Sequence, residues 1–111
     1  MKATWLSISA AAMLVLGTAQ VNAADMPPLA KASGCTACHA IDKKIVGPSW
    51  QAVADKYKGG DAKADLISKV KAGGKGNWTE VTKGVPMPPY SPRVADADIE
   101  KLVDFVLGLA Q

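Results

Sequence analysis

Two cysteines and a histidine stand within five consecutive residues, as Cys35, Cys38 and His39 of the run C-T-A-C-H. Cysteines three positions apart on one helical turn can each form a thioether to a vinyl group of the same porphyrin. The histidine that follows can then swing under the ring, where an imidazole nitrogen can bind the iron. The spacing therefore predicts one haem c, covalently attached through Cys35 and Cys38, with His39 as an iron ligand.

Three other chemistries use cysteines at this spacing, and each fits the chain less well. A thioredoxin-like C-x-x-C follows a strand in a β-α-β unit, whereas a helical pattern precedes Cys35. A zinc site needs four ligands, and the chain offers two cysteines and one histidine. A Cys35–Cys38 disulfide suits an oxidising compartment but leaves His39 without a role.

The second iron ligand is predicted by elimination. His39 is the only histidine, and methionine is the other ligand that suits an electron-transfer haem, because it raises the reduction potential. Of the four methionines, Met1 and Met13 fall in the leader described below, and Met26 is close in sequence to the attachment site. Met87 lies in the run V-P-M-P-P, where the prolines fix φ and stiffen the loop. We expect Met87 to bind iron rather than to fill a gap in the core.

The chain begins with a predicted signal peptide over residues 1–23. Lys2 provides a basic start, residues 5–18 are apolar or carry small hydroxyls, and Val21-Asn22-Ala23 has the small residues of a cleavage site. The apolar run is shorter than the roughly 20 residues of a spanning helix, so cleavage is favoured over an N-terminal anchor. We expect residues 24–111 to form the mature domain in the periplasm, without membrane insertion.

Length and composition indicate one small domain whose core needs an additional stabilising group. The chain has 111 residues, of which 49% are hydrophobic and only 5% aromatic, and a core this small is often completed by a metal, a disulfide or a cofactor. Without Lys2, 12 basic and 10 acidic residues leave a charge of +2, and two haem propionates would bring it near zero. No basic run with interleaved aromatics indicates a nucleic-acid partner.

The elements that must position these residues are short helices. No segment alternates with period two, so we expect no strands and an all-α fold of four or so helices around one haem. The expected helices are one that starts at Pro27-Pro28 and runs into the cysteines, one over 49–58 capped by Ser49, one capped by Asp61 and ended by Gly73-Gly74, and a last one capped by Asp96. Residues 73–95 are expected to form a long irregular loop, which is typical of a functional segment.

The motifs together resemble those of the short bacterial class I cytochromes c. The resemblance covers residues 25–110 and rests on C-T-A-C-H, Gly47-Pro48, a Gly-rich segment with Trp78, and V-P-M-P-P before a final helix. It implies an all-α fold around one haem, His/Met ligation, and one-electron carriage between periplasmic partners. By residue match it also implies that the Pro48 carbonyl accepts a hydrogen bond from the His39 ring.

The same resemblance assigns residues to the haem propionates and marks two departures. Trp78 would approach one propionate, and Lys69 matches a position where a basic side chain can pair with one. The segment from Trp78 to Met87 is a few residues longer than in the proteins it most resembles. Tyr90 stands where these proteins often have an asparagine that hydrogen-bonds the methionine sulfur.

A haem with protein ligands on both faces has no free site for a substrate, so we expect an electron carrier and not an enzyme. We expect a monomer in a respiratory chain, with donor and acceptor proteins that dock transiently at the haem edge. Lys43, Lys44 and Lys83 could form a positive rim there for an acidic partner. Two alternatives remain: a haem subunit of a periplasmic dehydrogenase complex, and a gas-binding or peroxidatic haem, which requires Met87 to be off the iron.

Overall fold

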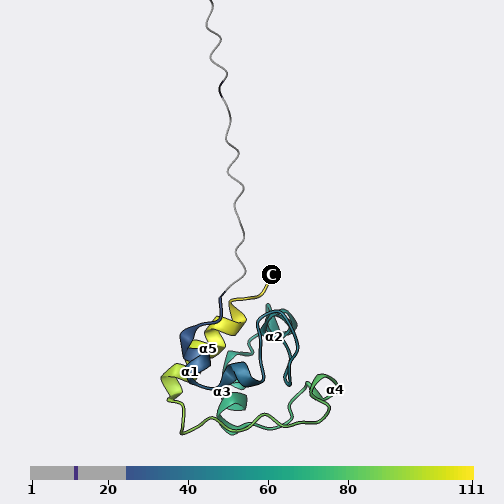
Figure 1. The fold of residues 1–111 in the computed structure, drawn as a ribbon, viewed down its shortest axis with the longest axis vertical. Coiled ribbons are helices and arrows are strands. Elements are labelled where there is room, and N and C mark those ends of the chain that lie inside the picture. The colour runs from purple at the N-terminus through teal and green to yellow at the C-terminus, as the bar shows by residue number, and fades with distance from the viewer. Residues whose placement is uncertain (1–11, 13–24) are drawn as a thin grey trace, which may run out of the picture.

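The structure is a computed structural model that describes residues 12 and 25–111, so all but one residue of the predicted signal peptide lies outside the described part. The described chain is helical, and its only β-type pairings are two isolated bridges. This confirms the all-α fold. In chain order the elements are α1 (Pro28–Ala32), the 3-10 helix η1 (Cys35–Ala37), α2 (Trp50–Tyr57), α3 (Lys63–Ala72), α4 (Thr79–Thr82) and α5 (Asp96–Leu107) (Figure 1).

The N-terminal segment differs from the prediction of one helix that runs into the cysteines. Helix α1 starts at Pro28, where a missing N–H costs nothing, but it ends at Ser33. Gly34 then adopts a left-handed conformation with φ of +84°, which residues with a Cβ rarely adopt. Cys35 therefore starts a separate 3-10 turn, and Cys38 is its C-cap.

The later helices lie where the apolar periodicity predicts them, but two of their caps differ. The Oγ of Ser49 accepts a hydrogen bond from the Ala52 N–H at 3.1 Å, which confirms the predicted cap of α2. The N-cap of α3 is Ala62 rather than Asp61. The N-cap of α5 is Ala95, and Asp96 lies in the first turn, where its charge still complements the helix dipole.

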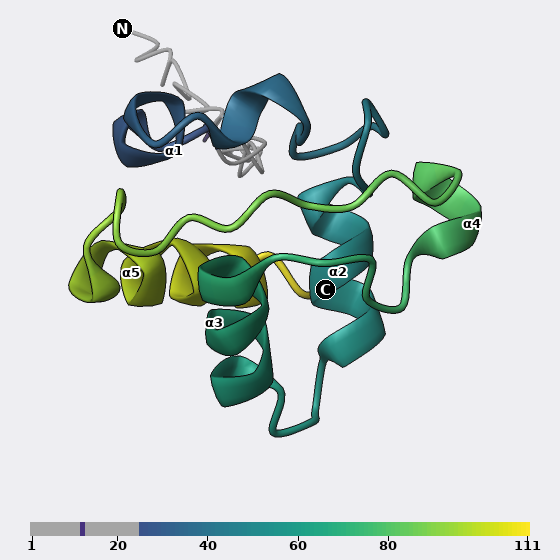
Figure 2. The ribbon, with the colours of Figure 1, turned by 90° about the horizontal axis from the view of Figure 1, so that it is seen from below.

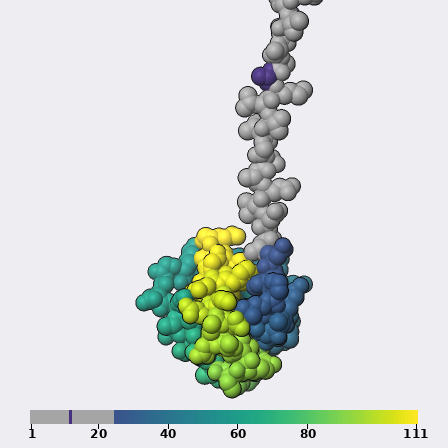
Figure 3. All heavy atoms as spheres, turned by 90° about the vertical axis from the view of Figure 1, so that its left-hand side faces the viewer, coloured from purple at the N-terminus to yellow at the C-terminus, as the bar shows by residue number. Residues whose placement is uncertain are grey.

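The core lies where α5 crosses α2 and α3 (Figure 2). One cluster of buried side chains joins α2 to α5 through Trp50, Val53, Leu102 and Val106. A second cluster forms around Ile99, which is fully buried. Figure 3 shows α5 and the loop before it against the N-terminal segment, in line with the contacts between α1 and α5.

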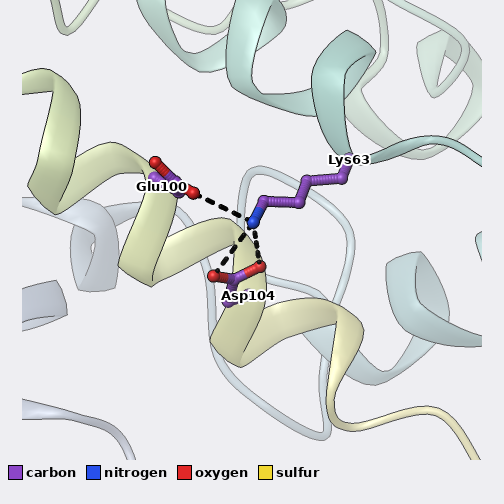
Figure 4. A network of polar contacts seen from close by, with 3 residues as sticks. All are labelled: Lys63, Glu100 and Asp104. Atoms are coloured by element: carbon purple, nitrogen blue, oxygen red, sulfur yellow. Dashed lines mark hydrogen bonds and ion pairs between the residues drawn. The ribbon is translucent and has the colours of Figure 1, made fainter.

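An exposed ion-pair cluster links α3 to α5 on the outside of the domain. The Nζ of Lys63 lies 3.0 Å from Glu100 Oε1 and 2.9 Å from Asp104 Oδ1 (Figure 4). All three side chains are about half exposed, so the cluster contributes little to stability. None of the three residues lines the cavity described below, so a substitution in this cluster serves as a control for substitutions at the cavity.

The segment over 73–95 contains a helix that the sequence does not predict. Helix α4 occupies Thr79–Thr82 and ends in two left-handed residues, Lys83 with φ of +57° and Gly84 with φ of +82°. Three of its four residues are β-branched, which lowers helix propensity and explains the wrong prediction. In both ribbon views α4 lies at the far end of this segment from α5 (Figures 1 and 2).

No helix of the described residues is long and apolar enough to span a membrane.

Candidate haem site

One cavity of about 290 Å³ brings the predicted functional residues together. Its lining comes from residues 35–48, from helices α2, α3 and α5, and from the segment over 74–90. All seven predicted site residues line it: Cys35, Cys38, His39, Pro48, Lys69, Trp78 and Met87. The remaining lining residues are mostly apolar, among them Val53, Leu66, Val70, Leu102 and Val106.

His39 is oriented by a hydrogen bond from its own ring. Its Nδ1 lies 2.8 Å from the carbonyl oxygen of Pro48. A carbonyl can only accept, so Nδ1 carries the proton and Nε2 keeps a free lone pair for a metal. Burial lowers the pKa of His39, with the hydrogen bond to Pro48 opposing the shift. The ring is therefore neutral at pH 7, as an iron ligand must be.

The His39 ring is also held by packing against Gly47 and beside Trp50. A Cβ added at Gly47 would lie 2.6 Å from the imidazole Cε1 and 3.0 Å from Nδ1, so the ring occupies the space that any other residue would fill. The ring of Trp50 lies 5.9 Å away between centroids. The Gly47 N–H donates to the Cys38 carbonyl at 2.9 Å, which closes the loop over the ring. The Gly47-Pro48 pair thus supplies both a contact and an acceptor.

The two cysteines are free thiols that line the cavity. Cys35 is 8% exposed, and Cys38 is half-buried. Burial raises the pKa of the Cys35 thiol, and a backbone hydrogen bond and, to a smaller extent, the positive charge of Arg93 oppose that rise. The two attachment residues thus lie on the same cavity as His39.

Met87 is held through its backbone. Its N–H donates to the Gly74 carbonyl at 3.0 Å, and its carbonyl accepts from the Gly74 N–H at 2.9 Å, which forms an isolated antiparallel bridge. Gly73 lies beside this bridge with φ of +70°, and a Cβ there would meet the Met87 carbonyl and lie 2.8 Å from the Pro89 nitrogen. The Gly-rich turn after α3 therefore fixes the position of the Met87 backbone beside the cavity.

Trp78 and Lys69 line the part of the cavity formed by the Gly-rich turn. Trp78 is half-buried, and the Lys56 ammonium lies 4.5 Å from the centroid of its ring. The Lys69 side chain runs along this turn, with its Nζ 3.5 Å from where a Cβ on Gly76 would lie. None of the ion pairs among residues 25–111 uses Lys69, so its charge is available to an anion at the cavity.

The cavity fits a covalently attached haem. It has two free thiols, a neutral imidazole with an unprotonated nitrogen, and a methionine thioether, all within an apolar lining. These are the attachment points and ligand types of a c-type haem. Because Gly47 has no side chain, the imidazole occupies the space beside it, and the protein alone orients the ring.

The residues that spacing alone misses are those that reach the cavity through tertiary packing. Tyr90 is 6% exposed and lines the cavity, although the sequence marks it only as a departure from the expected asparagine. Val46 and Val85 line it from two distant segments, and neither was among the predicted site residues. The signal that could have found them is their place in the two motifs' surroundings: Val46 precedes Gly47-Pro48, Val85 begins V-P-M-P-P, and Tyr90 follows it.

A short all-α domain built around such a cavity, with a C-x-x-C-H run at its N-terminal end, is a class I c-type cytochrome. The sequence model of the family "Cytochrome c" matches residues 20–110. The chain belongs to the cytochrome c family. It therefore carries one covalently attached c-type haem, and it is an electron carrier rather than an enzyme, like its small relatives.

Individual relatives agree with this assignment. Cytochrome c-551 of Allochromatium vinosum is 51% identical over 82 residues, which cover 73% of this chain and 82% of that protein. Cytochrome c-552 of Nitrosomonas europaea is 41% identical over 111 residues, which cover 98% of this chain and 99% of that protein.

Solved structures give the same result. The crystal structure of Nitrosomonas europaea cytochrome c552 has a TM-score of 0.65 at 40% identity and covers 73% of this chain and 95% of its own. The class 1 cytochrome MtoD from Sideroxydans lithotrophicus has a TM-score of 0.60 at 33% identity and covers 75% and 90%.

Proposed function

We propose that this cytochrome c is a periplasmic one-electron carrier of a respiratory chain, with His39 and Met87 as the two iron ligands. The observation that carries the proposal is that one apolar cavity is lined by a neutral imidazole with a free Nε2 and by a methionine thioether. Two protein ligands leave no iron position for a substrate. Because the protein fixes the positions of the two ligand side chains, the coordination geometry of the iron would change little between its two oxidation states, which suits electron transfer.

Each residue has a distinct task in this proposal. The haem, when bound, supplies a one-electron iron couple. Cys35 and Cys38 tether it, so that it is not lost. Pro48 fixes the tautomer and orientation of His39, as partners of metal-bound histidines do. The apolar side chains of α2, α3 and α5 exclude water and favour the less charged, reduced state.

Trp78 and Lys69 are proposed to hold the haem propionates. The indole N–H can donate one hydrogen bond, and the ammonium can form a charge-assisted one. The support is that both residues line the cavity at the Gly-rich turn and that Lys69 has no carboxylate partner within the described part of the chain.

Docking is proposed at an apolar patch formed by Ile45, Val46 and Val85. These are the exposed large hydrophobic residues of the described chain, at 43%, 39% and 48% exposure, and the two valines also line the cavity. The exposed lysines Lys43, Lys44 and Lys83 stand beside the patch in sequence. A small apolar patch beside positive charges suits brief contact with an acidic redox partner.

The same patch supports a second candidate, a haem subunit held by a periplasmic dehydrogenase. Gel filtration of the protein from its native periplasm separates the two functions. A free carrier elutes as a monomer at all salt concentrations, whereas a subunit co-elutes with its enzyme. For the free carrier, Lys44→Gln and Lys83→Gln should slow oxidation by an acidic partner at low salt, and Lys101→Gln serves as the matched control.

The ligands are tested with the purified mature protein. We expect an intact mass equal to residues 24–111 plus one haem, a low-spin His/Met spectrum, and no binding of carbon monoxide by the reduced protein at neutral pH. Met87→Ala should open the iron to carbon monoxide, while Met26→Ala should not. Carbon monoxide binding by the wild type, or its absence in Met87→Ala, would overturn the ligand assignment.

A further inference from the structure

Tyr90 and Arg93 form a stacked pair beside the cavity. The guanidinium carbon of Arg93 lies 4.8 Å from the centroid of the Tyr90 ring, within the range of a cation–π contact. Tyr90 is 6% exposed and lines the cavity, whereas Arg93 is exposed and does not line it. The charge of Arg93 is thus one aromatic side chain away from the cavity.

The backbone of Tyr90 is held on both sides, which keeps the stacked pair in place. Its N–H donates to the Val70 carbonyl at 3.1 Å, and its carbonyl accepts from the Val94 N–H at 2.8 Å. The ring also belongs to the buried cluster against which Met87 packs. Burial raises the pKa of Tyr90, so the phenol is neutral at pH 7 and adds no negative charge.

Arg93 forms no ion pair with any of the described residues. The nearby carboxylate of Asp98, which shares a surface hollow with it, pairs with Lys101 instead. Its guanidinium lies against the Tyr90 ring, and Tyr90 lines the cavity together with Cys35 and Met87.

We propose that Arg93, held against Tyr90, is a positioning residue that raises the reduction potential of the haem. Reduction moves one electron from a donor onto the ferric haem and lowers the charge in the cavity by one unit. A fixed positive charge outside the wall stabilises the reduced state more than the oxidised state. The inference rests on the proposed function, since it assumes a haem with His39 and Met87 as ligands.

The test is equilibrium titration of the holoprotein against a redox dye of known potential. Arg93→Gln should lower the equilibrium constant for reduction by on the order of two- to threefold, because Arg93 is exposed and its charge is partly screened. The decrease should shrink at high salt. Lys58→Gln removes an equally positive charge from an exposed residue at the end of α2 that neither lines the cavity nor pairs with a carboxylate side chain, and it should leave the constant unchanged. Arg93→Lys should restore most of the effect.

A double-mutant cycle tests whether Tyr90 holds the charge in place. In a Tyr90→Leu background, where the aromatic face is gone, Arg93→Gln should change the constant by less than in the wild type. An unchanged constant in Arg93→Gln, or an equal decrease in Lys58→Gln, overturns the inference. The low-spin spectrum, recorded for each variant, separates this failure from failure of the ligand assignment. If Tyr90→Leu does not fold, the comparison of Arg93→Gln with Lys58→Gln decides alone.

Discussion

The two walls of the cavity hold their proposed ligands by different means. On the histidine side, residues 39–50, the ligand is fixed through its side chain, by the 2.8 Å hydrogen bond to Pro48 and by contacts with Gly47 and Trp50. On the methionine side, residues 73–90, the ligand is fixed through its backbone, by the bridge to Gly74. No hydrogen bond to the Met87 sulfur is found in the described structure.

The difference follows from the chemistry of the two side chains. Imidazole has a second nitrogen that can donate, so one carbonyl sets both its tautomer and its orientation. A thioether has no donor and is a weak acceptor, so its position depends on the stiffness of the chain that carries it. Damage to the backbone should therefore release Met87 before it disturbs His39.

The largest effect is expected from Gly73→Ala on the methionine side. The new Cβ would meet backbone atoms of Met87 and Pro89, at a residue with φ of +70°. Since backbone atoms cannot step aside, we expect a loss of about 3 kcal/mol in the free energy of unfolding. Denaturant titration should show loss of methionine ligation before global unfolding.

A glycine at which a Cβ would make only an ordinary contact is the matched control for this substitution. Gly60→Ala places its Cβ at an ordinary 3.4 Å from the Tyr57 carbonyl, without a left-handed backbone. It should leave both transitions unchanged. Equal losses in the two variants would show that the bridge does not hold Met87.

Gly47→Ala tests the histidine side and should have a smaller effect. Here the Cβ meets a side chain, the His39 ring at 2.6 Å, and the ring can tilt. We expect a cost of about 2 kcal/mol and faster solvent exchange of the Nδ1 proton, measured by NMR. Methionine ligation should survive to the same denaturant concentration as global unfolding. Early loss of the methionine in this variant would contradict the separation of the two walls.

Thr82→Val should change stability in the opposite direction. The Oγ1 of Thr82 is buried and has no hydrogen-bond partner within the described residues. Replacing it with an isosteric methyl should raise the free energy of unfolding by about 1 kcal/mol. Thr79→Val, at an exposed position of the same helix, should be neutral. A loss of stability in Thr82→Val would show that the hydroxyl has a partner in the haem-loaded protein.

The smallest effect is expected from Lys63→Gln, away from both walls. Hydrogen bonds to Asp104 and Glu100 raise the pKa of Lys63. The stabilisation is present below the ordinary lysine pKa and is lost as the pH rises through the raised one. The small difference in melting temperature between wild type and variant should therefore vanish at high pH, with the reduction potential unchanged throughout. A changed potential would show that the outer face is coupled to the cavity.

The sequence predicts the fold well where periodicity is strong and poorly where backbone geometry decides. The helices over 50–57 and 96–107 carry clear apolar stripes and are confirmed. The break at Gly34 and helix α4 were not predicted, because a left-handed residue and a β-branched turn leave no periodic pattern. The predicted caps Asp61 and Asp96 are wrong for the same reason. The backbone enters the two helices at Ala62 and Ala95, each one residue from the predicted cap.

The site shows a similar division. The local run C-T-A-C-H and the single histidine suffice to predict the haem and one ligand, because that chemistry depends on adjacent residues. Contacts between distant segments, such as Gly47 beneath the imidazole or Arg93 on Tyr90, depend on how the chain packs. Spacing within one segment carries no information about them.

The most direct test of the account is the NMR spectrum of the reduced holoprotein with 13C-labelled methionine methyl groups. The predicted mature chain contains two methionines, Met26 and Met87. The methyl group of a methionine that binds the iron would lie in the ring current of the porphyrin, which shifts its resonance far upfield. We therefore expect one methyl resonance far upfield and one at the ordinary position. The upfield resonance should be lost in Met87→Ala. Two resonances at ordinary positions would contradict the ligation of iron by Met87.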